Sequence, residues 1–292
     1  MTLHVSQIFY SFQGEGARTG NLAVWLRLFG CNLRCPGFSQ QNPTDKSTYI
    51  PININPVDIK TLDDFPVIEY GCDTLYAIDP RFKHLRRDMK VEDAIKEVIS
   101  YLPDGKFIHP KTGNDIDLCI TGGEPLLQQN ELGNLFTLLN KEPFGYTPQT
   151  VQIETNGTTD ISRTFGSILD ACSFRTMFNI SPKLFNVSGE KYAWNYKAIA
   201  SYGYRSNYTT LKVVINNRDE SWNELEMHLQ KLVDVLDHPD YMPPIFIMPV
   251  GSTRDQQTNI KEIEEITKRA INEGYHISGR LHCLNLGNAI DV

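Results

Sequence analysis

Two closely spaced cysteines are the first residues of this chain that could do chemistry. Cys31 and Cys35 stand in GCNLRC at 30–35, where three intervening residues let both thiolates face a common point. The chain has six cysteines, and in a reducing compartment spacing this close indicates metal binding or redox chemistry rather than a disulfide framework. Half of a structural zinc site is the alternative, but such sites usually draw on two cysteine pairs, and this sequence offers one.

A glycine-rich turn is the second chemical motif. TGGEPLL at 121–127 follows an apolar run that predicts a strand and precedes a helical pattern. Gly122 and Gly123 let backbone approach a ligand closely, and Glu124 can accept hydrogen bonds from an ammonium group. Alone, the motif could be a strand–helix turn with a capping carboxylate. Its position after GCNLRC favours the ligand-binding interpretation, because both motifs point to one site.

In this order the two motifs resemble the radical S-adenosylmethionine superfamily. There, three cysteines in a CxxxCxxC loop hold a [4Fe-4S] cluster, and one open iron binds the methionine end of S-adenosylmethionine. Position 38 of this chain is Phe, and the residues that normally follow the third cysteine reappear at 71–74 as GCDT. The resemblance therefore implies an insertion at about 36–71 inside the cluster loop, with the cluster held by Cys31, Cys35 and Cys72.

Further features resemble one family, the 7-carboxy-7-deazaguanine synthases. They are SFQGEG at 11–16, Arg27, CDT at 72–74, ETNGT at 154–158, SPK at 181–183 and His282. Members of that family are carbon–nitrogen lyases that convert 6-carboxy-5,6,7,8-tetrahydropterin into 7-carboxy-7-deazaguanine with loss of ammonia, a step toward queuosine and related deazapurines. The resemblance covers nearly the whole chain outside 36–71 and 76–90, and implies a partial (β/α) barrel of the radical S-adenosylmethionine type.

The resemblance also implies roles for residues at matching motif positions. His282 and Glu15 would be catalytic, and Thr74 would ligate Mg²⁺, which prefers oxygen ligands. An arginine fork suits a planar carboxylate, which fits Arg27 as a partner of the substrate's carboxylate. The pterin would be bound by Phe12, Gln13, Gly14, Arg27, Thr121 and Val292. S-adenosylmethionine would be bound by Asp73, Gly122, Gly123, Glu124, Thr155, Ser181, Pro182, Lys183, Met248, Pro249, Val250 and Gly251.

Several of these residues have plainer interpretations. Arg27 could form a structural ion pair, and a lone histidine such as His282 on a strand is commonly a satisfied core residue. Cys119, Cys172 and Cys283 lie in apolar segments and are expected to be small buried hydrophobic residues. Gly71 stands where the family has an apolar residue that packs on adenine, so Tyr70 or a residue of the insertion is expected to replace it.

The elements that must position these residues alternate along the chain. Short runs rich in β-branched residues predict strands at 22–30, 116–121, 150–155, 177–181, 210–215 and 245–250. Helical periodicity predicts helices at 92–102, 130–139, 222–236 and 260–271, the third with a capping box of Ser221 and Glu224. Repeated strand and helix indicate parallel βα units, whose chemistry sits at the carboxyl ends of the strands.

Two segments break this pattern. Residues 36–71 carry five prolines without sustained periodicity and predict a long loop. Residues 77–90, AIDPRFKHLRRDMK, are locally basic and predict either a solvated helix face or a partner contact.

Composition restricts the partners. The chain has 292 residues, 40% hydrophobic and 22% charged, with a net charge of −7, which favours a small-molecule substrate over nucleic acid or anionic lipid. No apolar run is long enough to span a membrane, so we expect a cytoplasmic protein with one domain over 1–292. The family resemblance adds a homodimer and an electron donor such as flavodoxin.

Two rivals remain open from the sequence. One is a radical S-adenosylmethionine activase that acts on a partner protein, against which SFQGEG and the short carboxyl end argue. The other is a regulatory or interaction module that kept the fold but lost the cluster, an alternative sustained by the displacement of Cys72 from its usual place.

Overall fold

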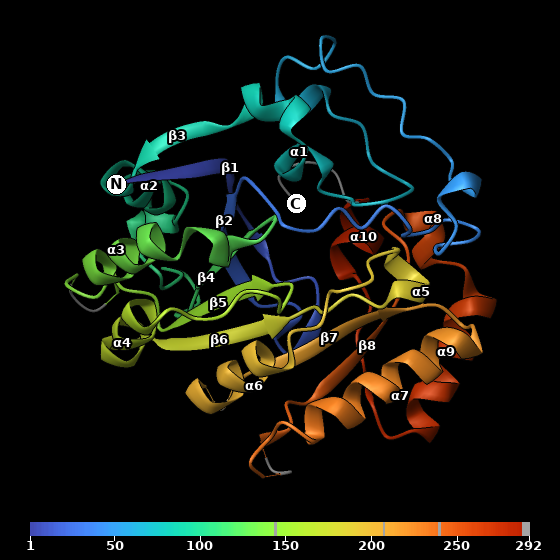
Figure 1. Ribbon diagram of the computed structural model, residues 1–292. Coiled ribbons are helices and arrows are strands. Elements are labelled where there is room, and N and C mark those ends of the chain that lie inside the picture. The colour runs from blue at the N-terminus through green and yellow to red at the C-terminus, as the bar shows by residue number, and fades with distance from the viewer. Residues whose placement is uncertain (143–144, 207, 239–240, 288–292) are drawn as a thin grey trace.

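In the computed structural model, which describes residues 1–142, 145–206, 208–238 and 241–287, nine strands form one sheet in the order β3-β1-β2-β4-β5-β6-β7-β8-β9 (Figure 1). β1 pairs antiparallel with β2 and β3, and every pairing from β2 to β9 is parallel. The sheet is open between β3 and β9, as the predicted partial barrel requires. The strands are β1 Thr2–Phe12, β2 Leu22–Leu28, β3 Arg87–Lys90, β4 Asp117–Gly122, β5 Thr150–Thr155, β6 Arg175–Ile180, β7 Thr210–Ile215, β8 Ile245–Pro249 and β9 His276–Ile277.

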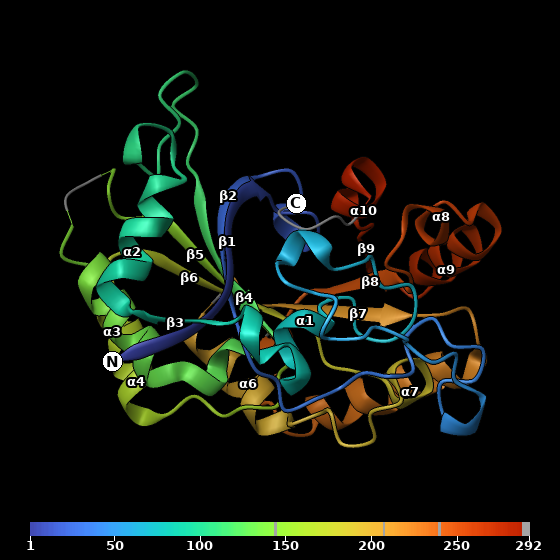
Figure 2. The ribbon, with the colours of Figure 1, turned by 90° about the horizontal axis from the view of Figure 1, so that it is seen from above.

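The longer helices connect successive parallel strands and pack along one side of the sheet (Figures 1 and 2). No helix in the described part of the chain combines the length and apolar character that crossing a bilayer requires. The helices are α1 Leu75–Ile78, α2 Val91–Ser100, α3 Gln129–Leu139, α4 Arg163–Ala171, α5 Phe185–Ser188, α6 Tyr196–Arg205, α7 Asp219–Val233, α8 Arg254–Gln257, α9 Ile260–Asn272 and α10 Leu281–Leu286.

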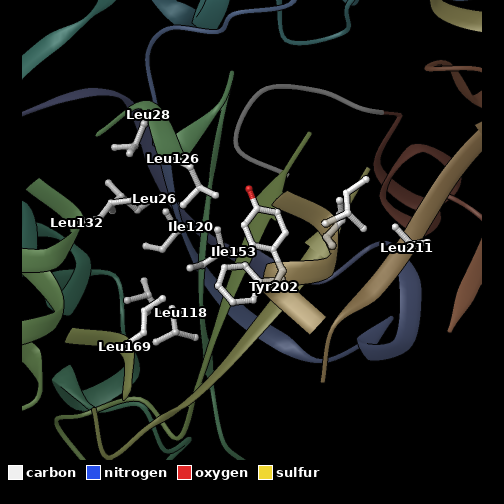
Figure 3. Packing of buried hydrophobic residues seen from close by; sticks show 14 of the residues in the cluster. Leu26, Leu28, Leu118, Ile120, Leu126, Leu132, Ile153, Leu169, Tyr202 and Leu211 are labelled. Atoms are coloured by element: carbon white, nitrogen blue, oxygen red, sulfur yellow. The ribbon is translucent and has the colours of Figure 1, made fainter. Parts of the chain in front are cut away.

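Alternation along the strands separates a packed face from a face that lines a cavity. On β2, Leu26 and Leu28 are fully buried and lie among leucine and isoleucine side chains of neighbouring elements (Figure 3). Burial of one such side chain stabilises the fold by roughly 1.5–3 kcal/mol. Trp25 and Arg27 alternate with them and point to the opposite side, toward the cavity described below. The core face thus fixes which β2 side chains are available for chemistry.

Most predicted elements are confirmed, and two strands have the predicted bounds, β5 at 150–155 and β7 at 210–215. The predicted capping box is wrong. Helix α7 begins at Asp219, so Ser221 lies inside it and donates to the Asn216 side chain, while Glu224 accepts hydrogen bonds from α5. His282 lies on α10 rather than on a strand.

The loop predicted at 36–71 is confirmed, with only two short 3-10 turns, Lys46–Thr48 and Leu62–Asp64. It nevertheless has an apolar cluster of its own, in which Ile59, Phe65 and Ile68 are buried against Tyr76 and Phe82. The following segment forms α1, a 3-10 turn at Pro80–Leu85 and β3. Its arginines are paired locally, Arg81 with Asp79, Arg86 with Asp88 and Arg87 with Glu97.

Candidate active site

A cavity of about 250 Å³ lies at the carboxyl ends of the parallel strands. Successive strands or the turns after them supply its walls, as expected for a parallel α/β fold. Cys31 follows β2, Gly123 follows β4, Asn156 follows β5, Ser181 follows β6 and Val250 follows β8. The insertion and the segment before α10 complete the walls.

Most residues predicted for the site line this cavity. The structure brings together Phe12, Gln13, Gly14, Glu15, Arg27, Cys31, Cys35, Cys72, Asp73, Thr74, Thr121, Gly122, Gly123, Thr155, Ser181, Lys183, Met248, Val250, Gly251 and His282. Glu124, Pro182 and Pro249 adjoin lining residues without lining the cavity themselves. Val292 lies outside the described residues. The ligand that each of these residues contacts remains a prediction.

The three predicted cluster cysteines converge although 36 residues separate Cys35 from Cys72. All three are free, line the cavity, and pack against one small apolar cluster with Leu33 and Ala193. Burial raises the pKa of the Cys72 thiol to about 11, and the nearby Cys31 sulfur adds to the increase. Coordination to iron displaces the thiol proton, so a cluster would remove the cost of keeping these sulfurs ionised in an apolar wall. Their chemistry therefore fits an iron–sulfur cluster.

A four-iron cluster and a mononuclear metal site require different arrangements of their ligands. Among the described residues, no group of three or more His, Cys, Asp or Glu side chains is arranged to hold a single metal ion. In a four-iron cluster each thiolate binds a different iron, so the sulfurs are spread more widely than around one zinc ion. The choice between the cluster and the zinc alternative stays a prediction from the motifs.

The GGE turn packs directly on the cysteine loop. A Cβ on Gly123 would lie 2.3 Å from the Gly30 carbonyl oxygen and 2.7 Å from the Cys31 Cβ. Glycine is therefore needed here to admit the cysteine loop. Glu124 is the capping carboxylate of the plainer interpretation, because it accepts from the Leu126 backbone N–H at 3.0 Å and from the Asn156 N–H at 2.7 Å. Burial raises the pKa of Glu124 to about 7 despite these hydrogen bonds.

A second part of the cavity lining contains a chain of buried ion pairs. Lys212 Nζ lies 2.5 Å from a Glu154 oxygen and 2.9 Å from Glu15 Oε2. Arg280 continues the chain, with Nε 2.8 Å from Glu15 Oε1 and Nη2 2.6 Å from Asp73 Oδ2. We call Glu154, Lys212, Glu15, Arg280 and Asp73 the ion-pair chain. It links the SFQGEG motif to the cluster loop and to the segment before α10.

The ion-pair chain keeps its members charged. Burial alone would raise the pKa of Glu15, but Lys212 and Arg280 outweigh it and hold that pKa well below the usual range. Burial alone would lower the pKa of Lys212, but the Glu15 and Glu154 carboxylates raise it. Both oxygens of Glu15 are engaged by cations, so at neutral pH this residue is an ionised anchor rather than a proton donor.

His282 lies against the SFQGEG turn. A Cβ on Gly14 would lie 2.0 Å from His282 Nδ1, so the glycine makes room for the imidazole. Burial and the Arg280 charge lower the pKa of His282 to about 4. The ring is therefore neutral at physiological pH and can accept or donate a hydrogen bond in the cavity.

Arg27 is one of the cations that line the cavity. Among the described residues it makes no ion pair, and its side chain donates a hydrogen bond to Gln7 Oε1 at 3.3 Å. Its guanidinium lies 5.9 Å from the ring centroids of Phe9 and Tyr76, and Phe9 stacks on Trp25. The cavity thus offers a guanidinium beside flat aromatic surfaces, a combination suited to a planar carboxylate.

Sequence reasoning missed several lining residues. Lys212 could have been found, because a lysine inside the apolar run TLKVVI must be paired when the strand is buried. Asn156 stands in the recognised ETNGT motif, and its side-chain nitrogen lies 3.8 Å from the Cys31 sulfur. Arg280 carries no local signal, because its partners are distant in sequence. Of the three remaining cysteines, Cys119 and Cys283 are buried as predicted, but Cys172 is only half-buried at the end of α4.

Comparison with known proteins gives relatives of one kind over most of the chain. A 7-carboxy-7-deazaguanine synthase of Pyrobaculum aerophilum is 24% identical over 98% of this chain and 96% of its own length. One of Halobacterium salinarum is 26% identical over 96% of this chain and 89% of its own length. One of Hyperthermus butylicus is 32% identical, but that match covers 53% of this chain and only 43% of the relative.

Structural comparison agrees on the fold. QueE from Escherichia coli, at 21% identity, superposes with a TM-score of 0.54 over 97% of this chain and 95% of that one. No protein-family model matches the sequence. The resemblance inferred from the motifs is thus confirmed along nearly the full length, and the chain is a relative of the 7-carboxy-7-deazaguanine synthases.

Proposed function

We propose that this chain is a radical S-adenosylmethionine lyase that converts 6-carboxy-5,6,7,8-tetrahydropterin into 7-carboxy-7-deazaguanine with loss of ammonia. The observation that carries the proposal is one cavity lined both by three free cysteines and by Arg27, which lies beside aromatic rings and makes no ion pair with the residues that the structure describes. The full-length relatives that carry the synthase name support it and do not favour an activase or a cluster-less module.

The residues of the proposed cofactor site would hold the cluster and enclose S-adenosylmethionine. Cys31, Cys35 and Cys72 would hold the [4Fe-4S] cluster. The cluster and S-adenosylmethionine together supply one-electron chemistry, and the protein supplies orientation and shielding. S-adenosylmethionine would lie along the carboxyl ends of β4, β5, β6 and β8, with Gly123, Thr155, Ser181, Lys183 and the 248–251 segment around it.

The insertion contributes to the proposed cover. Phe38 and Ser39 line the cavity, whereas Tyr70 does not, so Phe38 is the better replacement for the apolar residue missing at Gly71. The Lys183 Nζ lies 5.8 Å from the centre of the Phe38 ring, which helps hold the ring in place. An apolar cover of this kind excludes water from a reactive site.

The proposed substrate site uses the other wall. Arg27 would bind the pterin carboxylate, Phe12 would contact the flat ring, and the ion-pair chain would form the adjoining part of the wall. His282, neutral at physiological pH, would hydrogen-bond to the substrate beside Glu15. Thr74 would supply one oxygen ligand to Mg²⁺, with substrate oxygens as others.

The remaining proposals concern the setting of the reaction. We place the chain in the cytoplasm as a homodimer of single-domain subunits spanning 1–292, with the insertion at about 36–71. A small-molecule pterin is the substrate, and an electron donor such as flavodoxin would reduce the cluster. The product would enter queuosine or another deazapurine pathway.

Anaerobic reconstitution tests the proposal. The protein is loaded with iron and sulfide and incubated with the carboxy-tetrahydropterin, S-adenosylmethionine, Mg²⁺ and a reductant, and the deazaguanine is followed by mass. A cluster with pterin turnover is expected. A cluster with turnover only beside a partner protein would support the activase instead, and no cluster would support the module.

A matched pair of variants tests the substrate wall. Arg27→Gln should retain the cluster but raise the KM for the pterin at least tenfold, because a charge-assisted fork to the carboxylate is lost. Arg163→Gln removes the same charge at an exposed position on α4 and should leave KM unchanged. Equal KM values in the two variants would count against Arg27 as the carboxylate partner.

A further inference from the structure

The three cavity cysteines have different surroundings. Cys31 Sγ accepts a hydrogen bond from the Leu33 backbone N–H at 3.4 Å, and Cys72 Sγ lies 3.4 Å from the Thr74 hydroxyl. Within the described residues, no donor lies within hydrogen-bond distance of the Cys35 sulfur. The group that approaches the Cys35 backbone is instead a carboxylate, that of Glu190.

Glu190 binds the cysteine loop through two backbone groups at once. Its Oε1 accepts hydrogen bonds from the N–H groups of Arg34 and Cys35, each at 2.7 Å. Cys35 has a φ of +48°, a left-handed conformation that L side chains adopt only when neighbouring contacts hold them there. The carboxylate therefore holds the turn at the residue whose sulfur faces the cavity.

Glu190 is itself held in place by α5. Its backbone N–H donates to the hydroxyl of Ser188, which is fully buried and donates to the Leu184 carbonyl at 2.7 Å. The Gly37 N–H, just after Cys35, donates to the Ser188 carbonyl at 2.8 Å. Helix α5 and the cysteine loop are thus joined on both sides of Cys35.

Helix α7 completes the support. Glu224 accepts from the backbone N–H groups of Phe185 and Asn186, at 2.6 and 2.9 Å, and so caps the first turn of α5. One glutamate fixes the start of α5, and a second, just after its end, fixes the cysteine loop. A side chain anchored in this way has a defined position relative to the sulfur.

We propose that Glu190 is the positioning residue for the second cluster thiolate, and that its negative charge lowers the reduction potential of the cluster. The inference deepens the proposed function, because it assumes that Cys35 is a cluster ligand. A fixed negative charge beside a cluster opposes the addition of an electron, and net charge and hydrogen bonding at the sulfurs set such potentials. Glu190 supplies the negative charge, and its carboxylate accepts the hydrogen bond of the Cys35 backbone N–H.

Neutralising the charge while keeping the acceptor tests the electrostatic part. Glu190→Gln retains a side-chain oxygen of the same reach, so the reconstituted protein should contain as much iron as the wild type. Its cluster should have a higher midpoint potential in a redox titration followed by electron paramagnetic resonance. Glu92→Gln removes an exposed carboxylate on α2 and should leave the potential unchanged. An unchanged potential in Glu190→Gln overturns the inference.

Removing the acceptor tests the positioning part. Glu190→Ala leaves the two N–H groups without their carboxylate and should lose most of the iron after reconstitution. The circular dichroism of the apoprotein should match the wild type, which separates cluster loss from unfolding. Full iron content in Glu190→Ala also overturns the inference. A wild-type protein that takes up no cluster defeats the proposed function itself, so the two failures are distinguishable.

Discussion

The two walls of the cavity are built by opposite means. On one wall the ion-pair chain places three carboxylates and two cations side by side, and each recorded contact is between groups of opposite charge. On the other wall Cys31, Cys35 and Cys72 lie against Leu33 and Phe38, with raised thiol pKa values. On the first wall each of these charges has a partner of opposite sign. The second wall offers sulfurs whose ionised form needs a further partner.

The difference indicates which part of the cavity forms when the protein folds and which part is completed only when the cluster binds. Buried charges are tolerated only when paired, so the ion-pair chain must form as the protein folds. The folded apoprotein can bury these thiols without a metal, because a neutral thiol packs as a small apolar group. We therefore expect changes in the ion-pair chain to cost stability, and changes at the thiols to cost the cluster with little effect on the apoprotein.

The largest effect is expected at the thiol wall. Cys72→Ala should abolish pterin turnover and prevent stable cluster formation, because a ligand of the iron is lost. Cys172→Ala, at a half-buried position just after α4 and outside the cavity lining, should keep both. Iron content and product mass measure the outcome, and equal loss in the two variants would contradict the ligand assignment.

The next effect is expected in the ion-pair chain. Lys212→Met leaves Glu15 and Glu154 facing each other without the cation between them. Removal of one partner from a buried pair typically costs about 3 to 5 kcal/mol, so the free energy of unfolding should fall by that amount. Denaturant titration of the apoprotein under anaerobic, reducing conditions measures it.

Lys268→Met is the matched control for Lys212→Met. It breaks an exposed pair with Glu264 on α9 and should leave the denaturation midpoint nearly unchanged. A similar shift in both variants would mean that the ion-pair chain is no more important for stability than a surface pair.

The sequence predicts the two walls unequally. The parallel strands are recognisable because each is a short apolar run, and their carboxyl ends place Cys31, Thr121 and Ser181 near one another. The burial of Lys212 follows from its strand, although its partners do not. The position of Cys72 beside Cys31 and Cys35 is predicted from the GCDT motif and not from hydrophobic periodicity.

The rest depends on contacts between distant segments. Glu190 is 155 residues from Cys35 in the chain, and Arg280 is 207 residues from Asp73. No local sequence pattern predicts such pairs, because a polar residue in a loop can equally well form its hydrogen bonds within its own turn. The capping box failed partly for this reason, since Glu224 accepts from Phe185, 39 residues away, whereas Ser221 donates to the nearby Asn216.

The smallest effect is expected from Glu224, which supports the thiol wall through α5. Burial alone would raise the pKa of its carboxyl, but His228 and the N–H groups of Asn186 and Phe185 outweigh burial and lower that pKa. A depressed folded-state pKa contributes stability that is fully present above the unfolded value, about 4.3, and is lost as the pH falls through the folded value. Glu224→Gln removes this contribution.

The pH dependence of the unfolding free energy tests the support of α5 separately from cluster binding. Between pH 6 and 3 the unfolding free energy of the wild-type apoprotein should fall more steeply than that of Glu224→Gln, so the difference between them shrinks with acid. Glu92→Gln, at an exposed position, should give a curve parallel to the wild type. Parallel curves for Glu224→Gln would mean that α5 is not held by an ionised carboxylate. The measurement needs no cluster. A steeper wild-type curve would therefore mean that the support of the thiol wall through α5 forms on folding, whereas its sulfurs still await the cluster.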